Sequence, residues 1–247
     1  MEFLRPADWG EALAAKAAHP TAVPIAGGTD VMVEINFDHR RPGYLLDLNR
    51  IAELREWEVG EDAVRLGASV PYAQIMEGLH RELPGLALAP HTVASPQIRN
   101  RGSVGGNLGT ASPAGDAHPA LLAAGAPVEA ESVRGSRLIP IDAFCTGVKR
   151  NAPAPDELIR AVHVTKAAGP QQYSKVGTRN AMVIAVCAFG LAKRFAELCA
   201  GAANPIHDVR GTASYRKHAV GIMARRALGW TWESYRRGTG RGAEGVA

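Results

Sequence analysis

Some segments of the chain alternate apolar and polar residues with the two-residue period of a strand, and others follow the period of a helix. The two patterns together predict a mixed α+β fold. Alternating apolar and polar positions over Leu158–Thr165 predict a strand, and short apolar runs predict strands at Tyr44–Leu48 and Val64–Ala68. Good helix formers fill 10–18, with Asp8 placed to cap them. Further helices are expected at about 70–79, 85–94, 116–125 and 215–228, and further strands at 128–132, 137–141 and 171–176.

Capping and breaking residues set the boundaries of these elements. Ser69 followed by Pro71 predicts a capped helix start, and Gly125 predicts a helix stop. The run 181–198 is apolar and then helical in character, and residues 236–247 are expected to form a disordered tail. No internal repeat is evident.

A glycine-rich stretch over 99–116 is expected to be a long loop that binds a ligand. It contains five glycines and short hydroxyl residues, and it offers almost nothing that could fill a core. The segment Ile25-Ala-Gly-Gly-Thr-Asp30 has the same character. Glycines let a ligand approach the backbone, and clustered N–H groups bind anions such as phosphate. Two such loops favour a dinucleotide ligand over the alternative of two ordinary tight turns.

Composition is typical of a soluble globular protein. The 247 residues are 46% hydrophobic and 21% charged, and the sequence shows neither a transmembrane run nor a secretory signal, so a cytoplasmic location is expected. The net charge is +4, with seven Lys or Arg against two Glu from Arg216 onward. A solvated helix face with a mobile tail, or a surface that docks on an acidic partner, is favoured here over a nucleic-acid surface.

Several function classes are excluded by missing motifs. The chain has no nucleotide-triphosphate loop and no Gly-x-Gly-x-x-Gly fingerprint. Its three cysteines (Cys145, Cys187 and Cys199) are too scattered for a zinc or iron–sulfur site. No catalytic acid, base or nucleophile stands in a suggestive context. The remaining pattern suits a cofactor that supplies its own chemistry.

Several motifs, taken in this order, resemble the FAD-binding subunit of molybdenum hydroxylases, the family of xanthine dehydrogenase, carbon monoxide dehydrogenase and aldehyde oxidase-like enzymes. They are Ala26-Gly-Gly-Thr-Asp30, Pro96-Gln-Ile-Arg-Asn-Arg-Gly-Ser-Val-Gly-Gly-Asn107, Ala111-Ser-Pro-Ala-Gly-Asp116, and the segments 156–159, 173–179 and 208–218. The resemblance implies an FAD-binding domain of the vanillyl-alcohol-oxidase (PCMH) type over 1–165, with subdomains of about 1–55 and 56–165. A small α+β C-terminal domain over 166–235 would follow.

The resemblance also implies the cofactor contacts. The loop formed by Pro24, Ile25, Ala26, Gly27, Gly28, Thr29, Asp30 and Val31 would wrap the FAD pyrophosphate. A second set would line the other phosphate and the ribityl chain: Ser103, Gly105, Gly106, Asn107 and Thr110. Asp116 would accept hydrogen bonds from the cofactor, Ile159 would lie near the adenine or the ring system, and Lys175 would approach the flavin. No catalytic residue and no metal ligand are implied in this chain.

The family's division of labour implies the partners. A large subunit with the molybdenum cofactor hydroxylates the substrate, and a small subunit carries two [2Fe–2S] clusters. Electrons would then pass through FAD to NAD⁺, O₂ or another acceptor. Two alternatives stay open. One is an assembly subunit without a redox role. The other is a free-standing FAD oxidoreductase related to the cell-wall enolpyruvyl reductase, for which no catalytic acid is evident.

One departure from the family pattern falls near 191–193. In the family, several strands follow the segment that ends near Leu191, whereas here it runs directly into a segment typical of a later helix. Several dozen residues are missing at this point. A genuine deletion and a join between two pieces of a longer chain both fit. A deletion would expose an unpaired edge of the C-terminal sheet.

Overall fold

The computed structural model describes residues 1–179, 182–191 and 212–240. Its first sheet has three parallel strands in the order β1–β3–β2: β1 (Glu2–Leu4), β2 (Val23–Ile25) and β3 (Tyr44–Asp47). Helix α1 (Trp9–Ala18) joins β1 to β2, and α2 (Val31–Asn36) lies between β2 and β3. The 3₁₀ turn η1 (Ala52–Arg55) leads out of this region.

The start of α1 is fixed by reciprocal capping. The Asp8 carboxylate accepts from the Glu11 backbone N–H at 2.8 Å, and the Glu11 carboxylate accepts from the Ala7 N–H at 2.7 Å. Two backbone donors that a helix start leaves free are thereby satisfied. The predicted Asp8 cap is confirmed.

The second sheet has five antiparallel strands in the order β4–β5–β10–β6–β7. They are β4 (Trp57–Val59), β5 (Ala63–Gly67), β10 (Leu158–Thr165), β6 (Val128–Ser132) and β7 (Gly135–Ile139). The alternating strand β10 takes the central position and pairs with β5 and β6. A separate ribbon joins β8 (Cys145–Gly147) to β9 (Arg150–Asn151).

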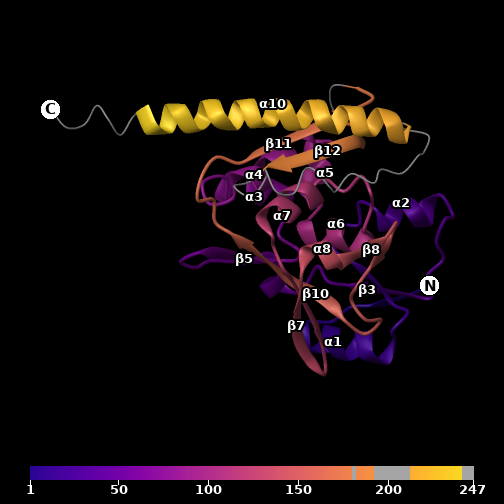
Figure 1. Ribbon diagram of the computed structural model, residues 1–247. Coiled ribbons are helices and arrows are strands. Elements are labelled where there is room, and N and C mark those ends of the chain that lie inside the picture. The colour runs from indigo at the N-terminus through magenta and orange to yellow at the C-terminus, as the bar shows by residue number, and fades with distance from the viewer. Residues whose placement is uncertain (180–181, 192–211, 241–247) are drawn as a thin grey trace.

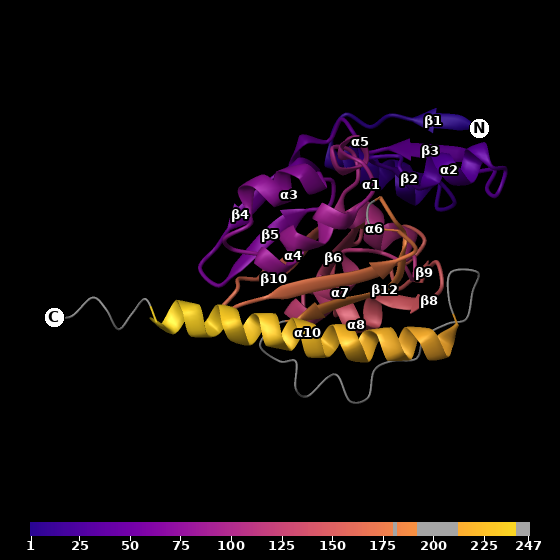
Figure 2. The ribbon, with the colours of Figure 1, turned by 90° about the horizontal axis from the view of Figure 1, so that it is seen from above.

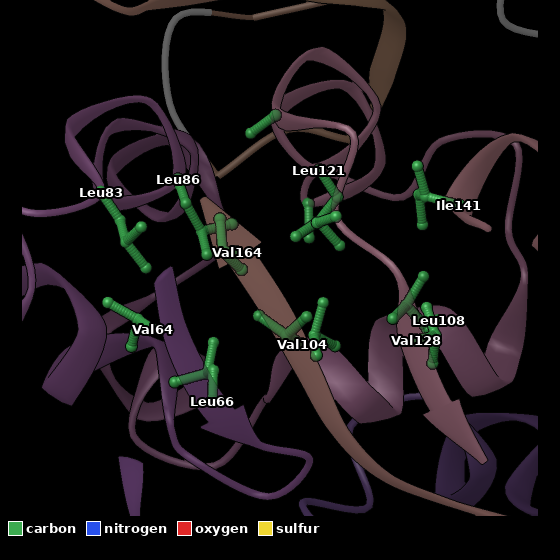
Figure 3. Packing of buried hydrophobic residues seen from close by; sticks show 14 of the residues in the cluster. Val64, Leu66, Leu83, Leu86, Val104, Leu108, Leu121, Val128, Ile141 and Val164 are labelled. Carbon is green, nitrogen blue, oxygen red and sulfur yellow. The ribbon is translucent and has the colours of Figure 1, made fainter. Parts of the chain in front are cut away.

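Short helices cover one face of this sheet and enclose its core. They are α3 (Tyr72–Gly78), α4 (Pro84–Leu88), η2 (Ala89–Thr92), α5 (Pro96–Arg99), α6 (Val104–Thr110), α7 (His118–Ala124) and α8 (Ile141–Phe144). Figure 3 shows Val64 and Leu66 from β5 and Val164 from β10 pointing toward Leu86 and Leu121 from the helices. These buried side chains fix the helices over the sheet.

A second apolar cluster joins the two sheets. It contains Leu13 and Leu46 from the N-terminal region together with Ala68 and Leu158 from the five-stranded sheet. Ile159 packs against both this cluster and the main core. The α+β class is confirmed, and the two sheets meet along a shared apolar seam.

The C-terminal part is a two-stranded sheet covered by one long helix. Strand β11 (Gln172–Gly177) pairs antiparallel with β12 (Ala185–Leu191), and α10 (Ala213–Gly240) runs along both (Figures 1 and 2). A Cβ at Gly190 would lie 2.3 Å from the Pro119 carbonyl oxygen, so β12 approaches the start of α7 closely. None of the described helices combines the length and apolar character needed to cross a membrane.

The structure corrects several predicted boundaries. The stretch 99–116 is not a continuous loop, because it contains the helix α6. The helix expected over 85–94 is divided into α4 and the 3₁₀ turn η2, which begins at Ala89 and has Pro90, without an N–H, in its first turn. Ser69 is not a cap, since Pro71 takes the N-cap position of α3. The helix expected from Asp116 begins two residues later, at His118.

The C-terminal expectations are corrected in part. Residues 185–191 form strand β12, and the helix predicted over 215–228 extends to Gly240, so 236–240 are helical and not a disordered tail. The rest of that tail, Cys199, and residues 192 and 193 of the expected deletion point lie outside the described residues. Cys187 lies half-buried in β12.

Candidate functional site

The two glycine-rich segments lie backbone against backbone beside the seam between the sheets. A Cβ at Gly27 would lie 2.0 Å from the Arg101 carbonyl oxygen, an approach that only glycine permits. Gly28 has a φ of +75°, which L side chains rarely adopt. The chain therefore turns from β2 into α2 directly beside the second segment, and the fold brings the two predicted loops together.

The first segment presents backbone donors without protein acceptors. The amide groups of Gly27, Gly28 and Thr29 donate no hydrogen bond to any other residue within the described part of the chain. Successive N–H groups of this kind form a concave site for an anion. The segment thus has the donors that a phosphate group requires.

Polar side chains of the second segment hold its own backbone and reach the first. The Ser103 hydroxyl accepts from the Gly106 N–H at 3.1 Å, and the Asn107 side-chain oxygen Oδ1 accepts from the Ala117 N–H at 3.2 Å. The Thr110 hydroxyl lies 3.1 Å from the Asp30 carboxylate, across the gap between the segments. The hydrogen-bond groups that the sequence suggested for a ligand therefore also shape the site itself.

Replacing Ser103 with alanine should lower the free energy of unfolding by about 1 kcal/mol, because the side chain caps α6 and is buried. Chemical denaturation of both proteins measures the difference. The exposed Ser136 on β7 offers a control, since Ser136→Ala should leave stability unchanged. Equal stability of the Ser103 variant and the wild type would show that the cap does not hold α6.

Two cavities open on either side of these segments. The first has a volume of about 630 Å³, and its lining includes the apolar residues Leu48, Leu158 and Ile159. The second has a volume of about 470 Å³ and ends against Tyr72 and Asp116. A shared wall contributes to both cavities: Pro24, Ala26, Asp30, Val31, Gly106, Thr110 and Lys149.

The predicted site residues are distributed between these cavities. Ile25, Gly27, Gly28 and Thr29 line the second cavity, as do Ser103, Asn107 and Asp116. Gly105 and Ile159 line the first. Apart from Lys175, each of the remaining predicted residues belongs to the shared wall.

Lys175 lines neither cavity; it stands behind Asp116. Its ammonium group donates to the Asp116 carboxylate at 2.8 Å and to the Thr92 carbonyl at 2.9 Å, and the side chain is only 2% exposed. The Tyr173 hydroxyl donates to the same carboxylate oxygen at 3.1 Å. Burial, followed by the charge of Asp116, raises the pKa of Tyr173, so this hydroxyl stays a neutral donor. The network ties β11 to the wall of the second cavity.

Three cavity residues carry no sequence signal and were not predicted. The Tyr72 hydroxyl is buried beside the second cavity, and no group in the described ranges accepts from or donates to it. Lys149 lies in the shared wall. Lys16 lines the first cavity, where its ammonium donates to the Pro20 and Ala22 carbonyls and burial lowers its pKa. Only the tertiary fold brings these residues to the site.

This fold and site define a protein that binds an elongated, phosphate-bearing cofactor, with no cluster among the described residues that could hold a metal. The family described as the FAD binding domain in molybdopterin dehydrogenase matches residues 1–166. The chain belongs to this family, and its cofactor is FAD.

Two curated relatives and one solved structure are similar to this chain. The chain is 33% identical over 181 residues to the xanthine dehydrogenase FAD-binding subunit of Escherichia coli O157:H7, a match covering 72% of this chain and 61% of the relative. It is 36% identical over 180 residues to the nicotinate dehydrogenase FAD-subunit of Eubacterium barkeri, covering 70% of this chain and 60% of the relative. The matches thus span about three fifths of these relatives. Carbon monoxide dehydrogenase from Hydrogenophaga pseudoflava superposes with a TM-score of 0.86 at 26% identity, covering 95% of this chain and 98% of that chain.

The residues present fit FAD. Free amide donors at Gly27–Thr29 suit a phosphate, and the buried Tyr72 hydroxyl offers a hydrogen bond to a polar atom of a ligand in the second cavity. The apolar lining residues of the first cavity, Leu48, Leu158 and Ile159, suit contact with a flat heterocycle. These features are properties of this chain and do not depend on the relatives.

Proposed function

We propose that this chain is the FAD-binding electron-transfer subunit of a molybdenum hydroxylase. The observation that carries the proposal is the divided cavity, whose two halves meet at a wall beside free backbone donors. FAD has the matching layout, with a diphosphate between two ring systems. The chemistry that FAD supplies when bound is the exchange between one-electron and two-electron transfer.

The two cavities suit different ends of the cofactor. We assign the flavin end to the second cavity, where Tyr72 and Asp116 offer polar groups to a ring that carries N–H and carbonyl groups. We assign the adenine end to the first cavity, where Ile159 and Leu158 offer an apolar surface. Lys175 then acts through Asp116, whose carboxylate it holds at the cavity wall.

The proposed partners follow from the chemistry that this chain lacks. Its three cysteines stand at 145, 187 and 199, a spacing that does not suit an iron–sulfur cluster. Electrons would therefore arrive from a [2Fe–2S] subunit, which a molybdopterin-containing subunit reduces while it oxidises the substrate. NAD⁺ or another acceptor would receive them. The names of the relatives, which describe FAD subunits of xanthine and nicotinate dehydrogenases, support this arrangement.

The full chain should take up FAD in a one-to-one ratio when it is purified and incubated with the cofactor. Visible absorption of the protein after gel filtration measures the bound flavin. A colourless protein that retains no FAD would overturn the proposal. In the assembled complex, the bound flavin should also be reduced when the iron–sulfur partner is reduced. A flavin that stays oxidised would favour an assembly role without electron transfer.

A further inference from the structure

The shared wall between the cavities holds one cation among its described members, Lys149. Two carboxylates stand beside it: Asp30 belongs to the wall itself, and Glu34 lines the first cavity one turn further along α2. A cofactor that spans both cavities must pass this wall. Under the proposed function, on which this inference rests, the part of FAD that passes it is the doubly charged diphosphate.

Lys149 has an anchored backbone and an exposed side-chain ammonium group. Its backbone N–H donates to the Ala111 carbonyl at 3.0 Å, which anchors it to the end of α6. Its φ of +54° is uncommon for a residue with a side chain. The side chain is 56% exposed and forms an ion pair with Glu34. An anchored backbone with an exposed ammonium can exchange one anionic partner for another without rearrangement of the fold.

Glu34 is ionised when it holds Lys149. The hydrogen bond from Lys149 is the largest effect that lowers the pKa of Glu34, and Arg40, 3.4 Å away, lowers it further. Glu34 and Asp30 would both repel a diphosphate at the shared wall, and Glu34 also engages Lys149, the cation of that wall, while Arg40 and Arg150 line only the first cavity. Repulsion between these carboxylates and a diphosphate is strongest where water is partly excluded from the cavity.

We propose that Lys149 is the counter-ion of the cofactor diphosphate, and that Glu34 competes with the diphosphate for the Lys149 ammonium group. Lys149 is a positioning residue that sets where the diphosphate lies along the wall. Helix α2 has no buried residue, so the ion pair with Glu34 is also one of the contacts that hold α2 in place. If Lys149 is the counter-ion, removing Lys149 and removing Glu34 have opposite effects on FAD binding, whereas a pair that only holds α2 gives the same effect for both.

The test compares Lys149→Gln with Glu34→Gln by titrating the full chain with FAD and following flavin fluorescence. Lys149→Gln should weaken FAD binding by roughly ten- to a hundredfold, the range expected for loss of one charge-assisted contact. Its affinity should also depend less on salt. Glu34→Gln should strengthen FAD binding, because a competing anion is removed. If the pair only latches α2, both variants should weaken binding alike, and the proposal is wrong.

Three controls isolate the diphosphate. Riboflavin, which has no phosphate, should bind Lys149→Gln and the wild type equally. Lys149→Arg should retain most of the FAD affinity, and this variant also carries the test if Lys149→Gln fails to fold. Lys166→Gln removes a cation that lines neither cavity and should change nothing. A wild-type chain that binds no FAD would overturn the proposed function, whereas normal FAD binding by Lys149→Gln would overturn only this inference.

Discussion

Alanine at Gly27 should strongly weaken FAD binding. A Cβ at this position would lie 2.0 Å from the Arg101 carbonyl oxygen and 2.6 Å from its carbon, and both are backbone atoms that cannot rotate away. The two glycine-rich segments must then separate, which moves the free amide donors away from the shared wall. Overpacking of this kind costs about 1–3 kcal/mol. Equilibrium dialysis with FAD should show roughly a hundredfold loss of affinity if most of that cost falls on the bound state.

A matched variant separates this clash from the general effect of replacing glycine. Gly43 precedes β3, and a Cβ there would meet no atom within 4 Å. Gly43→Ala should therefore bind FAD like the wild type. Thermal unfolding of both variants shows whether the chain still folds. A Gly27→Ala chain that folds and retains FAD at wild-type affinity would show that the contact between the two segments does not shape the site.

Local patterns predicted the elements whose residues fix their own structure. The alternation over 158–165 identified β10, and Asp8 marked the start of α1. Gly125 was predicted as a helix stop, and it takes the left-handed conformation at the end of α7. In each case the determining interaction lies within a few residues along the chain.

Helix α6 could not be predicted in this way, because tertiary contact overrides its composition. Glycines at 105, 106 and 109 are poor helix formers. Gly105, however, lies so close to β5 that a Cβ would stand 2.5 Å from the Ala68 carbonyl oxygen, and its N–H donates to that oxygen at 3.0 Å. Gly105 thus weakens the helix but also allows it to approach the end of β5. The sequence could show the glycines but not the surface that required them.

The site residues also separate into those that local sequence motifs predict and those that only the tertiary fold brings together. The glycine-rich segments were recognisable because each motif is local, and the fold brings them to one divided cavity. Tyr72 and Lys149 lie on a short helix and in a loop whose local composition is ordinary. Lys175 was expected to approach the flavin, and only the three-dimensional structure shows that Asp116 lies between it and the cavity. The assignment of each residue to a part of FAD remains a prediction.

Removing the Asp116 carboxylate should produce the largest loss of stability. Lys175 is 2% exposed, and within the described ranges its ammonium would keep only the Thr92 carbonyl as a partner. Breaking a buried ion pair by deleting one member costs about 3–5 kcal/mol, because the other charge stays buried and uncompensated. Asp116→Ala should lower the free energy of unfolding by about this amount. Denaturant titration measures it.

The same substitution should also weaken FAD binding, because Asp116 connects the C-terminal hairpin to the second cavity. Tyr173 and Lys175 on β11 both donate to its carboxylate, and the segment between β11 and β12 supplies Val183 and Ile184 to the cavity wall. A hairpin that is released from Asp116 would withdraw part of that wall. Limited proteolysis of Asp116→Ala should therefore cleave near this segment faster than in the wild type, and added FAD should protect the wild type more than the variant.

A double-mutant cycle distinguishes the ion pair from simple packing. Lys175→Met removes the buried charge while it keeps the length of the side chain, so Asp116→Asn should cost much less in that background than in the wild type. The coupling between the two positions should lie well above the roughly 0.5 kcal/mol scatter seen for independent sites. Additive losses would show that the two side chains stabilise the chain separately. In that case the hairpin would depend on the apolar contact of β12 with α7, and Asp116 would serve only the cavity.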